Sequence, residues 1–122
     1  MSRFMILLPA PEAEWARLPP EEHEKGMASH GQFQADLEAG GHRIIAVSPL
    51  EPSSLATSMR PDGNGGAIVT EGPFTESAEQ VVGFYYIESD NEAELREICA
   101  RFASRGELIE FRRRPQEDVE HD

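Results

Sequence analysis

Residues 81–88 read Val-Val-Gly-Phe-Tyr-Tyr-Ile-Glu, and this run decides the fold predicted for the 122-residue chain. β-Branched and aromatic residues fill every position before the final glutamate except Gly83, a composition typical of a β-strand. Successive side chains of a strand point to opposite faces, so Tyr85 and Tyr86 are expected in different layers. We therefore expect a central strand here, with one of the two tyrosines meeting a helix.

Three other segments are predicted as strands. Residues 3–8 form an apolar run that stops at Pro9, and residues 43–48 are largely apolar before Pro49. Residues 107–113 alternate between apolar and polar side chains, as expected for a strand with one buried face. Together with the central strand, these segments supply four strands for one sheet.

Two helices are predicted between these strands. Proline at a helix start and acidic residues in the first turn are both favourable, so the run Pro19-Pro20-Glu21-Glu22 begins the first helix. That helix ends at Gly40-Gly41 after about 20 residues. The second helix is capped by Ser89 or Asn91 and ends at Gly106. Its apolar residues recur at i, i+3, i+4 and i+7 and form one stripe: Leu95, Ile98, Cys99 and Phe102.

A hairpin is also predicted, from residues 55–60 and 67–70. The segment that joins them, residues 61–66, is rich in glycine, asparagine and aspartate, which tolerate turn conformations. With this hairpin treated as an insertion, the order of elements is strand, helix, strand, strand, helix, strand. This is the ferredoxin-like α+β order, an antiparallel sheet with both helices on one face. Residues 9–18 are expected to form a loop or a short helical turn, with Trp15 covering the edge of the core.

The second face of the predicted sheet has no helix to cover it. A domain of this size cannot leave a face that bears Val, Phe and Tyr side chains in water. We therefore expect the sheet to pack on a second copy of the chain across a two-fold axis, which makes the protein a homodimer.

Charge and composition exclude several kinds of partner. Eleven Lys and Arg against 23 Asp and Glu give a net charge of −12, so neither nucleic acid nor a membrane is an expected partner. The first apolar run ends at Pro9, too early for a membrane span. A single cysteine, Cys99, allows no internal disulfide and fits a reducing cytoplasm. Zinc-ligand spacing, flavin motifs and phosphate loops do not occur, so neither metal nor cofactor is expected.

A motif near the middle of the chain resembles a family signature. Residues 70–76, Thr-Glu-Gly-Pro-Phe-Thr-Glu, are followed by Glu79-Gln80 and Gly83-Phe84-Tyr85. The pattern resembles the Asp-Gly-Pro-Phe-Ala-Glu signature, and the Gly-Phe-Tyr run after it, of the YCII-related or DGPF-domain family. Similar matches occur at four other places: Phe4-Met5, Gly31-x-Phe33, Leu37-x-Ala39-Gly40 and Leu50-x-Pro52-Ser53. On this resemblance residues 1–114 form a YCII-related domain, and residues 115–122 are predicted to be a disordered acidic tail.

The resemblance implies a fold but no particular reaction. It implies a dimeric α+β barrel, in agreement with the uncovered sheet face. Better known relatives of the family include small-molecule isomerases, lyases and monooxygenases, and some members are encoded beside sigma-factor genes. One fold serves many activities, so function has to be argued from the residues of a site.

Glu71 takes the place of the leading aspartate of the signature. Gly72 permits a tight backbone, Pro73 fixes φ, and Phe74 is expected to anchor the turn in apolar surroundings, so the motif can hold the carboxylate rigidly. The alternative interpretation is a stiff turn that returns the hairpin to the sheet.

His30 is the expected partner for that carboxylate. Histidine takes up and releases protons near neutral pH. His30 shares a helical stripe with Met27, Phe33 or Gln34, and Leu37, and therefore points toward the sheet or the cleft at its edge. The alternative is a histidine with a purely structural role. We predict His30 and Glu71 as an acid/base pair, and the remaining histidines, His23, His42 and His121, as weaker candidates.

Three further residues are predicted to contact a ligand. Ser53 can donate a hydrogen bond, although turn capping is the competing role. Phe74 and Tyr85 can line an apolar pocket. Cys99 lies on the apolar stripe of the second helix and is expected to be a core residue.

Two functions from different classes follow from these predictions. The first is a cofactor-free acid/base enzyme of isomerase or lyase type, in which His30 and Glu71 move a proton on a small organic molecule. The second is a non-catalytic module that binds a small molecule or a protein partner and serves regulation, including regulation linked to sigma factors. A titratable pair favours the enzyme, whereas the change of aspartate to Glu71 favours the binding module.

Overall fold

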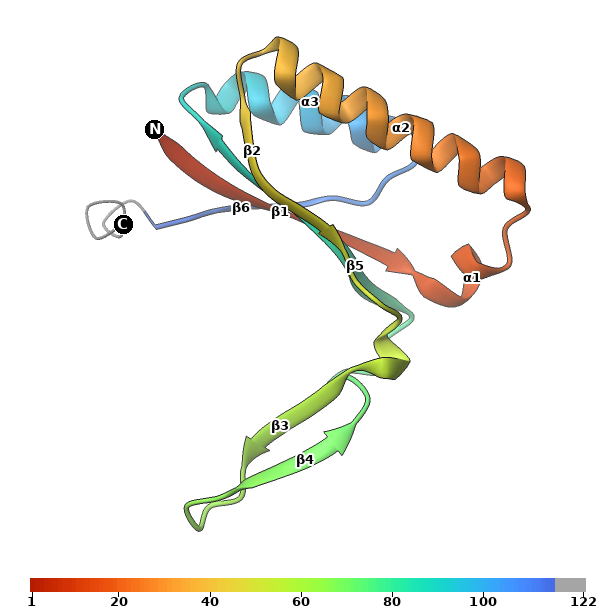
Figure 1. Cartoon of the computed structure of the whole chain (residues 1–122), viewed down its shortest axis with the longest axis vertical. Coiled ribbons are helices and arrows are strands. Elements are labelled where there is room, and N and C mark those ends of the chain that lie inside the picture. Colours follow the sequence, from red (N-terminus) through yellow and green to blue (C-terminus); the bar gives the residue numbers. More distant parts are fainter. Residues whose placement is uncertain (116–122) are drawn as a thin grey trace.

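In a computed structural model, which describes residues 1–115, the protein is an α+β domain with antiparallel sheets (Figure 1). Four strands form the main sheet in the order β2-β5-β1-β6, and β3 and β4 form a separate two-stranded sheet. The elements in chain order are β1 Ser2–Pro11, α1 Glu12–Ala16, α2 Pro20–Ala39, β2 Arg43–Pro49, the 3₁₀-helix η1 Ser53–Leu55, β3 Thr57–Pro61, β4 Ala67–Glu71, β5 Glu79–Ser89, α3 Glu92–Ser104 and β6 Glu110–Arg113.

The order of elements and the central position of β5 are confirmed. β5 pairs with β2 on one side and with β1 on the other, both antiparallel. β1 is longer than predicted because it continues through Pro9 to Pro11, with a register shift after Leu8, where proline cannot supply a ladder N–H. β6 is shorter than predicted, since residues 107–109 precede it as a connection.

Both long helices lie on one face of the sheet (Figure 1), and the core forms between them and that face. Alternation along β1 and β5 points every second side chain toward the helices. The predicted stripe of α3 is buried, and the Asn91 side chain caps this helix by accepting a hydrogen bond from the Glu94 N–H at 3.1 Å. The buried apolar residues are Phe4, Ile6, Leu8, Phe33, Leu37, Tyr85, Ile87, Leu95, Ile98, Cys99 and Phe102.

The opposite face of the sheet carries the alternate side chains of the same strands. Met5 pairs with Tyr86, and Leu7 with Phe84, in adjacent cross-strand rows that are only partly buried. At one end of this face the Glu88 carboxylate bridges two arginines, Arg3 at 3.3 Å and Arg43 at 3.1 Å. Within one chain the sheet is open and does not close into a barrel.

The hairpin of β3 and β4 projects away from the main sheet (Figure 1). Its cross-strand pair Met59 and Val69 is exposed. Beyond it, the expectation that Phe74 is anchored in apolar surroundings is wrong for the single chain, where 71% of this residue is exposed. Such a hairpin gains little stability by itself and needs a packing partner.

Two other expectations need correction, and one lies outside the structure. Trp15 is half exposed and stacks on His23 at a ring-centroid distance of 4.0 Å, so it does not close the edge of the core. Met27 is exposed rather than part of the buried stripe of α2. The predicted acidic tail, apart from Pro115, lies beyond the residues that the structure describes.

Across residues 1–115 the structure contains no helix with the length and apolar character needed to cross a membrane.

Candidate functional site

His30 projects from α2 toward the sheet, as its position three and seven residues before the buried Phe33 and Leu37 predicts. Its ring meets Phe102 edge to face, with 4.9 Å between ring centroids, and lies nearly parallel to the Tyr85 ring at 5.9 Å. Aromatic contacts on two sides fix the orientation of the imidazole, so its two nitrogens point to defined partners.

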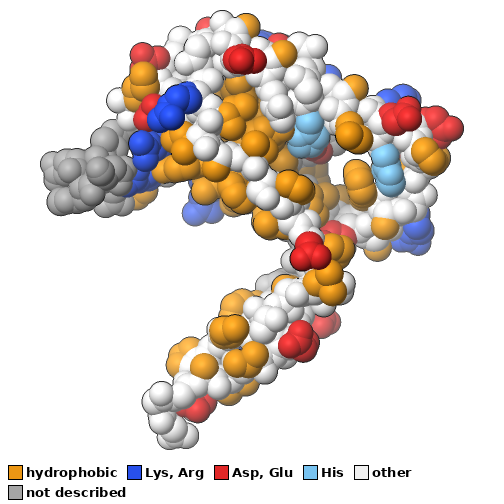
Figure 2. Space-filling view, viewed as in Figure 1, with side chains coloured by type: hydrophobic (Ala, Val, Ile, Leu, Met, Phe, Trp, Pro, Cys, Tyr) orange, Lys and Arg blue, Asp and Glu red, His pale blue; other side chains and the backbone are white. Residues whose placement is uncertain are grey.

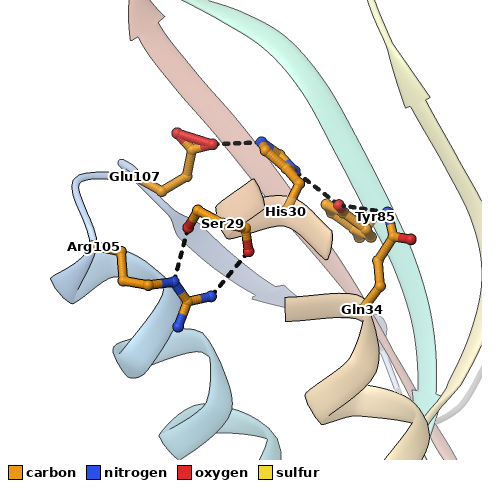
Figure 3. A network of polar contacts seen from close by, with 6 residues as sticks. All are labelled: Ser29, His30, Gln34, Tyr85, Arg105 and Glu107. Atoms are coloured by element: carbon orange, nitrogen blue, oxygen red, sulfur yellow. Dashed lines mark hydrogen bonds and ion pairs between the residues drawn. The ribbon is translucent and has the colours of Figure 1, made fainter. Parts of the chain in front are cut away.

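Those partners form a chain of hydrogen bonds through the imidazole (Figure 3). His30 Nε2 lies 2.6 Å from Glu107 Oε1, and His30 Nδ1 lies 2.8 Å from the Tyr85 hydroxyl. The Gln34 amide donates to the same hydroxyl at 3.1 Å. In the neutral ring one proton assignment satisfies every contact: Nε2–H donates to Glu107, and Nδ1 accepts from the Tyr85 O–H.

Tyr85 donates the hydrogen bond to His30 Nδ1, because its hydroxyl group stays neutral. Only 1% of the residue is exposed, and this burial raises the pKa of Tyr85. The hydrogen bond from Gln34 opposes that rise in pKa, and the nearby charge of Glu107 adds to it. The phenol therefore remains a hydrogen-bond donor to His30 across the neutral pH range.

A turn after α3 brings Glu107 to His30. Gly106 has a φ of +113°, a conformation that glycine adopts readily, and it turns the chain away from the helix. Arg105 fixes the turn against α2, since its guanidinium donates to the Ser29 hydroxyl at 2.8 Å and to the Ser29 carbonyl at 3.0 Å (Figure 3). Glu107, the next residue after the turn, is thus held by its neighbours in the chain.

Glu107 lines a hollow of about 220 Å³ that opens to solvent. About a third of each side chain is exposed, 34% for His30 and 30% for Glu107. Figure 2 shows this face of the molecule hollowed beside histidine side chains, with apolar atoms around the opening. Glu107 lines the hollow together with residues of β1, α1 and the adjoining loops: Pro9, Ala10, Pro11, Glu14, Trp15, Leu18, Gly106 and Leu108.

A second histidine cluster lies at the far end of α2, and its histidine and its serine are both buried. His42 Nδ1 lies 2.8 Å from the Ser89 hydroxyl, and His42 Nε2 lies 2.6 Å from Glu94 Oε1. This resembles a Ser-His-carboxylate arrangement, but Ser89 is 3% exposed, and its oxygen also accepts the Asn91 N–H at 3.0 Å. The cluster ties β5, the end of α2 and the start of α3 together.

Within one chain the structure does not bring His30 and Glu71 together. Glu71 is exposed at the end of β4, on the hairpin that projects away from α2 (Figure 1). The backbone beside it is fixed instead to the other strand, since the Gly72 N–H donates to the Ala56 carbonyl at 2.6 Å. Phe74 is likewise exposed outside the hollow that Glu107 lines.

Ser53 has a structural contact that the sequence did not reveal. Its backbone N–H and its hydroxyl donate to the two carboxylate oxygens of Glu12, at 2.9 Å and 2.5 Å. The pair joins the start of α1 to η1. Of the three predicted ligand contacts, Tyr85 alone joins the His30 chain of hydrogen bonds.

Sequence reasoning missed Glu107 and Gln34 as members of the site. Gln34 was visible as the residue one helical turn after His30. Glu107 directly follows Gly106, the glycine predicted to end the second helix, and this position suggested that it lies where the chain returns to the edge of the sheet. Across residues 1–115 no three His, Cys, Asp or Glu side chains are grouped so as to hold a metal ion.

Two comparisons relate the chain to known proteins. An uncharacterised protein of Rhizobium meliloti (strain 1021) is 38% identical over 69 residues, which cover 56% of this chain and 53% of that relative. The chain thus aligns with about half the length of the curated relative. A model of the YCII-related domain matches residues 2–109, a range that contains α2 with His30, β5 with Tyr85, and Glu107. On this match, which covers most of its length, the chain belongs to the YCII-related domain family.

Proposed function

We propose that the hollow beside Glu107 is an acid/base site that moves a proton on a small organic molecule. The observation that carries this proposal is the 2.6 Å contact between His30 Nε2 and Glu107 Oε1 at the wall of an accessible hollow. A carboxylate oriented by an imidazole, which is itself oriented by a buried tyrosine, has the parts that general acid/base catalysis requires.

The role of each site residue follows from which of its polar atoms already have a hydrogen-bond partner in the protein. Oε1 of Glu107 accepts from His30, whereas Oε2 has no partner among the described residues and is available to a ligand. Glu107 is therefore the base: it takes a proton from carbon, and the electron pair of the broken C–H bond stays on a ligand that can delocalise it. Return of the proton to a different atom gives an isomerase, and departure of a neighbouring group gives a lyase. His30 and Tyr85 are positioning residues, because they act through Glu107.

Deuterium exchange tests this proposal before a substrate is known. Wild-type protein in D₂O is incubated with small ketones, aldehydes and hydroxy acids, with and without an amino group, and loss of the C–H signal is followed by proton NMR. We expect catalysed exchange in at least one compound, and Glu107→Gln should slow it by at least ~100-fold, the contribution of a general base. Glu97→Gln, on the exposed side of α3, makes the same charge change and should leave the rate unaltered. Equal exchange by Glu107→Gln would contradict the assignment.

A second candidate function is ligand binding without turnover. The observation that favours it is that both ring nitrogens of His30 already have protein partners, which leaves the imidazole no free nitrogen for a substrate. In the exchange experiment a binding module would shift the NMR signals of the hollow on addition of a compound and would exchange none of its protons.

Homodimerisation is part of the same proposal. The partly buried Met5, Leu7, Phe84 and Tyr86 on the helix-free face, and the exposed apolar pair of the hairpin, support it. The pairing of His30 with Glu71 that the sequence suggested would require Glu71 from the second copy, because β4 of the same chain lies away from α2 (Figure 1), and we propose Glu107 as the partner in its place. Contact of Ser53 and Phe74 with a ligand remains a prediction.

A further inference from the structure

The walls of the hollow have an unusual charge composition. Its ionisable side chains are two carboxylates, Glu14 from α1 and Glu107, and no lysine or arginine lines it. Two nearby arginines are directed elsewhere: Arg17 donates to the Ala13 carbonyl at 3.0 Å, and Arg105 donates to Ser29. An anionic ligand would meet two negative charges here, in a protein whose net charge is −12.

The rest of the wall is apolar. The two carboxylates share the wall with apolar groups: the prolines at the end of β1, Leu18, Leu108 and the Trp15 indole. The volume of about 220 Å³ is below the ~300–1,000 Å³ typical of pockets for drug-sized ligands. The hollow therefore fits a small molecule with an apolar body rather than a nucleotide or a sugar phosphate.

From these observations we infer that the ligand of the hollow is a small organic cation, an ammonium group attached to an apolar body. Glu14 holds the ammonium group. Its side chain has no polar partner among the described residues, so no internal ion pair has to break when the ligand binds. The apolar body rests against Trp15 and the neighbouring leucines.

This inference deepens the proposed function and rests on it for the role of Glu107. Glu14 and Glu107 line the same hollow, so a ligand whose ammonium group binds Glu14 would place the neighbouring carbon in the space that Glu107 also lines. A neighbouring ammonium group makes the removal of a proton from that carbon easier, because it stabilises the negative charge left behind. The charge that recognises the ligand thus also assists the chemistry.

Binding is tested with three probes of similar shape and different charge. Benzylamine, benzyl alcohol and benzoate are titrated into ¹⁵N-labelled wild-type protein, and two-dimensional ¹H–¹⁵N spectra are recorded. Benzylamine should give saturable shifts at the Trp15 indole N–H and at the amides of Gly106, Glu107 and Leu108. Benzyl alcohol should bind at least roughly tenfold more weakly, the effect of one lost charged hydrogen bond, and benzoate should not shift these signals. Equal binding of the amine and the alcohol, or shifts confined to other residues, would overturn the inference.

A matched pair of variants locates the ammonium group. Glu14→Gln should weaken benzylamine binding by roughly tenfold and leave benzyl alcohol binding unchanged. The control Glu97→Gln makes the same charge change on α3 and should leave both unchanged. Unaltered amine binding in Glu14→Gln would reject Glu14 as the recognition group. If the amine binds selectively while no compound exchanges deuterium, the inference stands and the acid/base function fails. If instead a compound exchanges deuterium but amines do not bind selectively, the acid/base function stands and the inference of a cationic ligand fails.

Discussion

At the residue scale, the hydroxyl of Tyr85 links the sheet to two residues of α2. Its oxygen accepts from Gln34, and its proton faces His30 Nδ1, so a single buried group orients the imidazole. The pattern of residues 81–88 already separated Tyr85 from Tyr86, because adjacent strand positions face opposite sides.

Replacing Tyr85 by phenylalanine tests that link. Tyr85→Phe keeps the ring and removes both hydrogen bonds, so the free energy of unfolding should fall by about 1 kcal/mol. Tyr86→Phe is the matched control, since that hydroxyl has no partner among the described residues, and it should change stability very little. Urea denaturation of the two variants measures the difference. Equal stabilities would show that the Tyr85 hydroxyl does not hold His30.

Cys99 offers a second residue-scale prediction, on pH. Burial raises the pKa of Cys99 from 9.0 to about 11, against a smaller opposing effect of Arg96. The thiol should therefore react slowly with a thiol reagent at pH 8 in the folded protein and fast in urea. Because the folded-state pKa is the higher one, stability is retained below about pH 9 and decreases as pH rises toward about 11. Rapid labelling of the folded protein would contradict this burial.

The site shows which residue-scale features a sequence can predict. His30 faces the sheet because of its own helical spacing to Phe33 and Leu37, which is local information. Glu107 comes from a distant part of the chain. Its approach depends on the turn at Gly106, which the sequence predicted as the end of the helix, and on the clamp between Arg105 and Ser29, which has no sequence signature. The sequence predicted Glu71 as the carboxylate partner of His30 instead, because Glu71 lies in a recognisable motif.

At the element scale, the end of α2 packs against α3 through a glycine. A Cβ on Gly40 would lie 2.4 Å from Glu94 Oε1 and 2.8 Å from the ring of His42. The Glu94 side chain is partly exposed and has room to move, but the buried His42 ring does not. Gly40 therefore permits the contact among His42, Glu94 and Ser89 that joins the two helices to β5.

Two glycine substitutions, one at this contact and one in α2 away from it, test this packing. Gly40→Ala should lower the melting temperature, because the steric clash with His42 exceeds any gain in helix propensity. Gly26→Ala, at a position in α2 with nothing within 4 Å of the added Cβ, should raise stability by up to ~1 kcal/mol through helix propensity alone. Calorimetry of both variants gives the comparison. Stabilisation by both substitutions would show that the contact at Gly40 is loose.

Element boundaries were predicted well where local signals are strong. The prolines before α2 and the Asn91 cap of α3 mark helix starts, and both helices begin there. The predicted strand boundaries were wrong where pairing with a neighbouring strand decides them. β1 continues past Pro9 because β5 extends beside it. β6 begins only at Glu110, which pairs with Leu7 of β1. Strand length depends on the neighbouring strand as much as on composition.

At the scale of the whole molecule, the helix-free sheet face and the projecting hairpin lack partners within one chain. The sequence predicted an uncovered face from the count of helices and strands. It also predicted a buried Phe74, which is exposed here. The surroundings of the hairpin depend on what packs against it, and the composition of one chain does not contain that information.

The expected oligomer is a homodimer that buries the helix-free face. Phe84→Asp should give monomers or insoluble protein, since burial of an unpaired charge costs several kcal/mol. Met27→Asp is the control, because Met27 is 75% exposed on α2, outside this face, and it should leave the mass unchanged. Light scattering at micromolar concentration measures both. A monomeric wild type would refute the dimer.

The role of Glu107 as the partner of His30 is tested most directly by the protonation of the His30 ring, read from long-range ¹H–¹⁵N NMR of protein labelled in its histidines. We predict that the neutral ring carries its proton on Nε2, toward Glu107, and that Nδ1 accepts the Tyr85 hydrogen bond. Glu107→Gln should shift these nitrogen signals, whereas Glu71→Gln should leave them in place. A neutral ring protonated on Nδ1, or signals that respond to Glu71→Gln and not to Glu107→Gln, would contradict the assignment of Glu107 as the carboxylate partner of His30.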